Sequence, residues 1–231
     1  VRLVLFFALT WLGVAILLAF LLNEGRREAE RTAQSEALGI SRMLEARLAA
    51  TIRRVQGDLN HLVATLPRAA FKRGMVGQYG EAVVGELALY GGYFPELAGF
   101  RVMDATGAFL YASSPVLDTA SVDDRSYLSA LSESASHSLY FGQVEIERRS
   151  GRSLLPVSIA VRDAQGGLQG AIVALLDIAH LEQAFETTNV GPNGVIALRR
   201  TDDARLIFRR PLRPDLVNHA VTNNPLHMRL E

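Results

Sequence analysis

The N-terminal part of the chain begins with a long uncharged run, and this constrains the fold more than any other feature. Residues 3–22 (LVLFFALTWLGVAILLAFLL) carry no charge, and a run of about 20 apolar residues is long enough to cross a bilayer. A signal peptide has a shorter apolar core followed by a small-x-small cleavage site. The sequence AFLLNEGRR at the end of this run has no such site. We therefore expect an uncleaved transmembrane anchor over residues 1–23.

Residues 24–66 continue the helix with a different pattern. Apolar side chains recur mostly at steps of three or four, the period of one helix face, at Leu38, Ile40, Leu44, Leu48, Ile52, Val55, Leu59, Leu62 and Leu66. Such a helix would extend roughly 60 Å at about 1.5 Å per residue. It is either a coiled-coil spacer or a signalling stalk, and its apolar stripe can pack on a sheet, on the helix of a second copy, or on both. We expect a homodimer through this stalk helix.

The rest of the chain predicts short strands joined by turns. The sequence GFRVMDATGAFLYAS (99–113) indicates a hairpin with its turn at Asp104–Gly107, because Asp and Gly between two apolar runs mark a turn. Three further strands are expected at 139–147, 153–161 and 168–178, with SGR and DAQGG as the turns between them. The last two are apolar on both faces, so both faces of the sheet should be covered.

Short helices and a second hairpin complete the pattern. Helices are expected over about 78–90, 124–134 and 179–188. The hairpin formed by GVIALRR (194–200) and RLIFRRP (205–211) repeats the first one and indicates internal duplication. Because the chain ends within this repeated pattern, we expect it to be the N-terminal part of a longer polypeptide.

The composition excludes several classes of function. Lys plus Arg total 24, and so do Asp plus Glu, so no net charge attracts nucleic acid. The absence of cysteine excludes disulfides, thiol catalysis and cysteine metal sites. The histidines do not follow a metal-ligand spacing, and the chain has no P-loop, dinucleotide fingerprint or Gly-x-Ser-x-Gly elbow. We expect no catalytic residue, metal, cofactor or nucleic-acid partner in this chain.

The order of the elements, together with several short motifs, resembles a known family. The motifs are Asp124-Arg125-x-Tyr127 at a helix start, the turn at 150–152, Val157-Ser158-Ile159-Ala160, the closing strand at 170–178, and a second module that begins near residue 191 and includes Arg210-Pro211. This set resembles the double Cache (tandem PAS-like) sensor domains of bacterial transmembrane receptors. The resemblance implies an α+β fold: a transmembrane helix, a long stalk helix, then PAS-like antiparallel sheet modules flanked by short helices. A membrane-distal sensor module would span 67–190, and an incomplete membrane-proximal module 191–231.

The same resemblance implies a function. The chain would sit in the inner membrane of a bacterium, with the residues after about 23 in the periplasm or outside the cell. It would bind a small ligand and signal to a cytoplasmic output module beyond this chain. A diguanylate cyclase is the expected output, and a histidine kinase or chemoreceptor the alternative. From a different class, a ligand-free, membrane-anchored dimerisation domain stays open.

Arg125 is the first candidate for a ligand contact. In the family, the arginine of this motif often holds a ligand carboxylate, and a planar guanidinium matches a carboxylate with two hydrogen bonds. The alternative is a surface pair with Asp124, which would contribute little. Tyr127 is either a pocket wall or part of the core.

Three more candidates lie in the strands. Gln143 is on a polar strand face, which meets either solvent or a pocket. Ser158 is a lone hydroxyl in an apolar strand, bonded either to backbone or to a ligand. Asp177 stands where a strand meets a helix, as an N-cap or as the partner of a ligand ammonium.

Overall fold

The computed structural model describes residues 2–115, 117, 130–132, 138–186, 188, 190–191 and 194–221. The chain divides into two compact units, Val1–Ala49 and Ala50–Glu231. The first unit consists of helix alone, with large apolar side chains such as Trp11 and Leu22 exposed. In the part of the chain that the structure describes, no helix combines the length and the apolar character needed to span a membrane.

Helix α1 (Arg2–Thr65) contains the predicted stalk helix and ends one residue before its expected end, next to Pro67. Of the predicted apolar stripe, the residues Val55, Leu59, Leu62 and Leu66 are buried within the second unit, and Ile52 is half-buried. Two short 3₁₀ turns, η1 (Arg68–Phe71) and η2 (Arg73–Met75), lead into α2 (Val76–Gly91), which confirms the helix expected over 78–90. The predicted period therefore marks the face that packs on the module.

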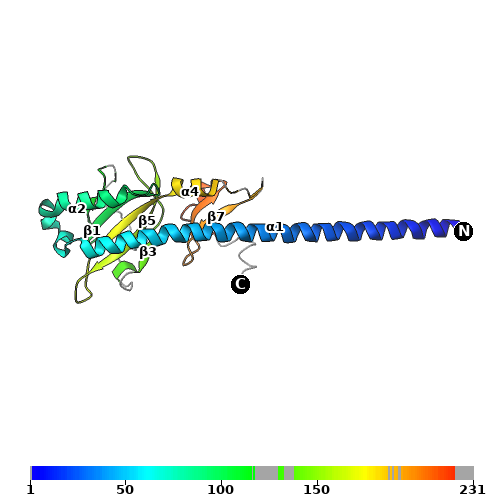
Figure 1. Ribbon diagram of the computed structural model, residues 1–231, viewed down its shortest axis with the longest axis horizontal. Coiled ribbons are helices and arrows are strands. Elements are labelled where there is room, and N and C mark those ends of the chain that lie inside the picture. Colours follow the sequence, from blue (N-terminus) through cyan, green and yellow to red (C-terminus); the bar gives the residue numbers. More distant parts are fainter. Residues whose placement is uncertain are drawn as a thin grey trace. The chain divides into compact units, whose positions relative to one another are not determined.

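The sheet is antiparallel throughout and has, within the described residues, the strand order β2-β1-β6-β5-β3, with β4 also paired to β5. Its strands are β1 (Leu97–Asp104), β2 (Phe109–Ala112), β3 (Leu139–Phe141), β4 (Glu145–Ile146), β5 (Ser153–Arg162) and β6 (Leu168–Asp177). Helix α2 packs against β1 and β2, as can be followed in Figure 1. Long stretches of β5 and β6 are buried on both faces, which confirms the expectation from their continuous apolar sequence.

The first hairpin forms where the sequence predicts it. Its turn is held by Asp104, whose Oδ1 accepts hydrogen bonds from the backbone N–H groups of Thr106 (2.8 Å) and Ala108 (3.0 Å). Arg73 adds an ion pair to the other carboxylate oxygen of Asp104. Tyr111 then ties β2 to η1, because its hydroxyl donates to the carbonyl oxygen of Ala70 at 2.9 Å.

One predicted strand was wrong in its extent. The segment 139–147 forms two short strands, β3 and β4, with 142–144 between them. Pro156 of the neighbouring β5 has no N–H group to donate to the segment. In addition, three residues (142–144) lie between the paired residues Phe141 and Glu145, whereas only two residues of β5 lie between their partners Val157 and Leu154. The extra residue and the missing donor interrupt the strand.

The chain continues through α4 (Ile178–Glu186) into a separate two-stranded sheet of β7 (Ile196–Arg199) and β8 (Leu206–Arg210), followed by η3 (Pro214–Leu216). The helix expected over 179–188 and the second hairpin are thus confirmed. Phe185 of α4 stacks on Phe208 of β8, with ring centroids 5.5 Å apart. The helix expected over 124–134 lies outside the described residues, apart from 130–132.

Candidate functional site

A pocket of about 220 Å³ lies against one face of the sheet. The strand register explains its floor, because Arg101 of β1 pairs with Val173 of β6, Val173 with Ser158 of β5, and Ser158 with Tyr140 of β3. Residues paired directly across a sheet point to the same face. Described residues that line the pocket are Arg101, Met103, Phe109, Tyr140, Gly142, Gln143, Val144, Glu145, Pro156, Ser158 and Val173.

Arg101 is one of two charged residues among the described residues that line this pocket. It is only 4% exposed, its Nη1 donates to Oε1 of Glu145 at 2.5 Å, and its guanidinium lies 5.3 Å from the ring centre of Phe109. Its buried Nε has no hydrogen-bond partner among the described residues. A buried, unpaired donor on a cation is costly, so the Arg101 guanidinium keeps a hydrogen-bonding capacity that the described residues leave unused.

The residues between β3 and β4 form one side of the pocket opening. We call Tyr140–Glu145 the rim segment; five of its residues, Tyr140, Gly142, Gln143, Val144 and Glu145, line the pocket. Gln143 is exposed and belongs to the lining, together with its neighbours Gly142 and Val144.

Ser158 and Asp177 have different surroundings. Ser158 lines the pocket, is 2% exposed, and donates from Oγ to the carbonyl oxygen of Tyr140 at 3.3 Å. Asp177 is not among the described residues of the lining. Its carboxylate accepts hydrogen bonds from the Ala179 N–H at 3.0 Å and from Nη1 of Arg152 at 3.3 Å. The capping alternative for Asp177 is therefore confirmed.

The two candidates in the Asp-Arg-x-Tyr motif, Arg125 and Tyr127, lie outside the described residues. Among the residues that the structure does describe, no group of His, Cys, Asp or Glu is placed to hold a metal ion. Arg101 and Glu145 were missed as site residues from the sequence. The available signal was a charge inside the apolar run GFRVM, at a position where a strand alternates.

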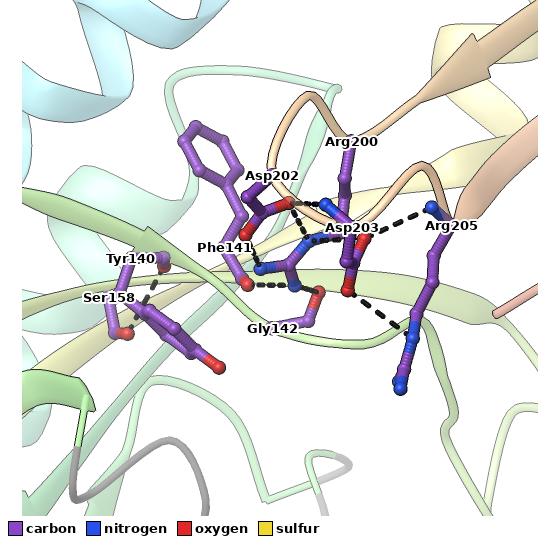
Figure 2. A network of polar contacts seen from close by, with 8 residues as sticks. All are labelled: Tyr140, Phe141, Gly142, Ser158, Arg200, Asp202, Asp203 and Arg205. Atoms are coloured by element: carbon purple, nitrogen blue, oxygen red, sulfur yellow. Dashed lines mark hydrogen bonds and ion pairs between the residues drawn. The ribbon is translucent and has the colours of Figure 1, made fainter. Parts of the chain in front are cut away.

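A second polar network joins the rim segment to the β7–β8 hairpin (Figure 2). Arg200 donates from Nη1 to the carbonyl oxygens of Phe141 and, at 3.3 Å, of Gly142. Its guanidinium also pairs with Asp202 at 2.5 Å and Asp203 at 3.4 Å. The hydrogen bond from Arg200 lowers the pKa of Asp202 to about 2, so the pair stays ionised at ordinary pH.

Asn218, which follows η3, holds the rim segment at a second point. Its Oδ1 accepts from the N–H of Val144 at 2.8 Å, and its Nδ2 donates to the carbonyl oxygen of Val144 at 2.7 Å. One side chain thus satisfies both backbone polar groups of Val144, in the way that a paired strand would.

No family model matches this sequence, and neither does any curated protein. Solved structures do match. The extracellular domain of rpHK1S-Z16, described as a histidine kinase, has a TM-score of 0.66 at 23% identity over 85% of this chain and 78% of that one. The sensor domain of the V. cholerae histidine kinase DctB has a TM-score of 0.50 at 16% identity, over 80% and 69% of the two chains.

A third structure extends the likeness to chemoreceptors. The ligand-binding domain of the Campylobacter jejuni chemoreceptor Tlp3, in complex with 4-methylisoleucine, has a TM-score of 0.55 at 11% identity, over 81% of this chain and 72% of that one. This chain therefore has the fold of extracellular sensor domains of histidine kinases and chemoreceptors.

Proposed function

We propose that this chain is the sensor part of a membrane receptor and that it binds a small acid in the pocket above Arg101. The observation that carries the proposal is the buried guanidinium of Arg101, a residue that lines the pocket and whose Nε has no hydrogen-bond partner among the described residues. The shared fold with ligand-binding domains of receptors supports the same function.

The chemistry of the guanidinium indicates how the acid binds. Nε and Nη2 lie on the same edge of the planar group and form a fork that matches a carboxylate. Glu145 accepts its hydrogen bond from Nη1, which lies outside this fork. A ligand carboxylate can therefore accept two hydrogen bonds from Arg101 while Glu145 keeps its own bond. Burial strengthens these bonds because little water competes for the same donors.

The residues around Arg101 restrict the size and the polarity of the remainder of the ligand. Met103, Phe109, Val144 and Val173 present apolar surface beside Arg101, which favours a short aliphatic or aromatic body. A volume of about 220 Å³ equals roughly seven water molecules at about 30 Å³ each, so the ligand is the size of an amino acid or a short organic acid. Glu145 would meet a ligand ammonium favourably, as an amino acid requires.

The wider receptor is part of the same proposal. The uncharged run over residues 3–22 would hold the chain in the inner membrane, with the pocket outside the cytoplasm and a homodimer formed through α1. The output module would be a diguanylate cyclase, with a histidine kinase or chemoreceptor as the alternative; the solved relatives with the same fold favour these last two. Fractionation of cell membranes and cross-linking along α1 test the anchor and the dimer.

The ligand is tested by titrating the full chain in detergent with acetate, propionate, succinate, benzoate, L-alanine and L-valine. At least one of these acids should give saturable heat and raise the melting temperature. Arg101→Gln should lower the affinity for that acid roughly 10- to 100-fold, because hydrogen bonds to charged groups contribute about 1.5–3 kcal/mol. Glu145→Gln, which keeps an oxygen acceptor for Arg101 and removes a negative charge, should tighten binding of an acid without an ammonium group.

The matched control is Arg213→Gln, since Arg213 is an exposed arginine that pairs with Asp215 away from the pocket. It should bind the acid like the wild type. Equal binding by Arg101→Gln and wild type would place the ligand elsewhere. If no acid binds, the alternative of a ligand-free dimerisation domain is favoured instead.

A further inference from the structure

The rim segment cannot hold its position by strand pairing alone. The ladder between β3 and β5 stops at Phe141, and the next pair along the chain is Glu145↔Leu154. Between them, the N–H of Gly142 donates to the carbonyl oxygen of Pro156 at 2.8 Å, whereas Pro156 has no N–H to return. The backbone of Val144 therefore needs partners from outside the sheet.

Asn218 supplies those partners from beside β8. The Asn218 backbone is itself anchored there, because its N–H donates to the carbonyl oxygen of Leu206 at 2.8 Å. Its φ is 63°, a left-handed conformation that Asn tolerates far better than most residues. The conformation turns the amide toward Val144, where it makes the two hydrogen bonds described above.

Arg200 supplies a third and a fourth bond at the other end of the rim segment. Its side chain is only 11% exposed, and its guanidinium lies 5.7 Å from the ring centre of Tyr140, a residue of the pocket lining. Figure 2 shows that the guanidinium of Arg200 pairs with Asp202 and Asp203 of the hairpin turn. The same group donates to the carbonyl oxygens of Phe141 and Gly142 in the rim segment. A planar group held on both sides has little freedom to rotate.

We infer that Arg200 and Asn218 are positioning residues of the ligand pocket, and that the β7–β8 hairpin completes the site by holding the rim segment. The inference rests on the proposed function. Gly142 and Val144 of the rim segment line the pocket. Their backbone groups are held by Arg200 in the hairpin turn and by Asn218 beside β8. Linkage then requires reciprocity: a ligand that orders the rim segment also stabilises its contacts with the hairpin, and loss of those contacts weakens the ligand.

The first measurement is hydrogen exchange at the Val144 amide in the full chain without ligand. Asn218→Gly removes the side chain without backbone strain, because glycine adopts positive φ freely. Protection of Val144 should fall by on the order of tenfold, the change expected for loss of one hydrogen bond. Asn218→Asp keeps an oxygen acceptor for the Val144 N–H but turns a second acceptor toward the Val144 carbonyl oxygen, so it should retain part of the protection. Equal protection in the wild type and the Asn218→Gly variant overturns the inference.

The second measurement is the affinity for the acid that binds the wild type in the titrations above. Asn218→Gly and Arg200→Gln should each weaken it by about tenfold, as expected for one or two lost hydrogen bonds at a site of contact, and the acid should in turn raise exchange protection in β8. Asn218→Asp should recover part of the affinity. Arg213→Gln, a substitution of an exposed arginine that does not touch the rim segment, should leave it unchanged.

The two proposals fail in different ways. If the acid binds the wild type, Asn218→Gly and Arg200→Gln with equal affinity, the positioning role is overturned and the sensor function stands. If no acid of the panel binds the wild type, the proposed function fails, and with it the ligand site that the hairpin would complete.

Discussion

At the scale of single residues, Arg101 combines a buried ion pair with a donor that the pair leaves unsatisfied. A buried arginine is tolerated only when its charge and donors are satisfied. Glu145 and the ring of Phe109 satisfy part of Arg101, whereas its Nε stays without a partner among the described residues. The remaining unsatisfied donor is the physical reason to expect an anion in the pocket.

Asp104 is the residue through which we expect folding stability to respond to acid. Burial alone would raise its pKa, but hydrogen bonds from Thr106, Arg73 and Ala108 together lower it below the ordinary 3.8. A lowered folded-state pKa means that Asp104 contributes stability above about pH 4 and that this contribution is lost as the pH falls through the folded-state pKa. Unfolding free energy measured from pH 6 to pH 2 should fall less steeply in Asp104→Asn than in the wild type. Equal slopes would show that Asp104 is not the titrating group.

At the scale of elements, β6 is the strand on which the sheet depends. It pairs with β1 on one side and β5 on the other, and the residues from Gly170 to Asp177 are buried. Val173 and Leu175 belong to the pocket-side core cluster, whereas Ile172 and Ala174 alternate with them on the opposite face. A disturbance in β6 therefore reaches both layers of the core.

Gly170→Ala should disturb this strand. A Cβ built on Gly170 would lie 2.2 Å from the carbonyl oxygen of Met103 and 2.8 Å from Cδ1 of Phe71, so the backbone of β1 must shift. We expect a loss of about 1–3 kcal/mol in the free energy of unfolding, the usual cost of overpacking. The matched control is Gly85→Ala in α2, where the Cβ would meet open space; it should gain about 0.5–1 kcal/mol from better helix propensity. Chemical denaturation of both variants measures these changes in the free energy of unfolding. An unchanged free energy in Gly170→Ala would contradict the close packing of β6 against β1 and Phe71.

At the scale of the whole molecule, the second unit is continuous from the sheet through α4 to the β7–β8 hairpin. Phe185 and Phe208 stack where α4 meets β8, and both are buried. Arg200 and Asn218 then return from the hairpin region to the rim segment. The hairpin region is thus joined to α4 by an apolar contact and to the rim segment by polar ones.

Phe208→Ala tests whether this continuity stabilises the whole unit. Truncation of a buried phenylalanine costs about 3–5 kcal/mol, so the melting temperature of the unit should fall clearly. Val195→Ala is the matched control, because Val195 is a half-exposed apolar residue just before β7. If calorimetry shows the hairpin melting separately, with the main transition unchanged in Phe208→Ala, then the hairpin does not share the cooperative unit.

Much of the secondary structure could be predicted because it depends on neighbours in sequence. The period of residues 24–66, the Asp104–Gly107 turn and the doubly apolar β5 and β6 are local signals, and each has its predicted structure. The strand expected over 139–147 was wrong because the interruption comes from Pro156, on another strand. The sequence of residues 139–147 alone does not indicate that Pro156 lies beside them.

The candidate site was predicted only in part, for the same reason. Gln143 and Ser158 lie in the pocket lining, Asp177 caps α4, and Arg125 and Tyr127 lie outside the described residues. As ligand contacts, all five stay predictions. Arg101, Glu145 and Asn218 were not chosen, because their importance depends on which residues they face across the sheet.

By itself, the sequence determined the long helix, the two hairpins, the α+β class and the residue types that a site could use, since periodicity and turn chemistry act over a few residues. Only the tertiary structure decided which polar residues share a pocket. The antiparallel register brings Arg101 of β1 into one row with Ser158 of β5, and Asn218 crosses 74 residues of sequence to reach Val144. Such contacts depend on strand pairing and on desolvation in the folded chain, and those forces act between segments that are distant in sequence.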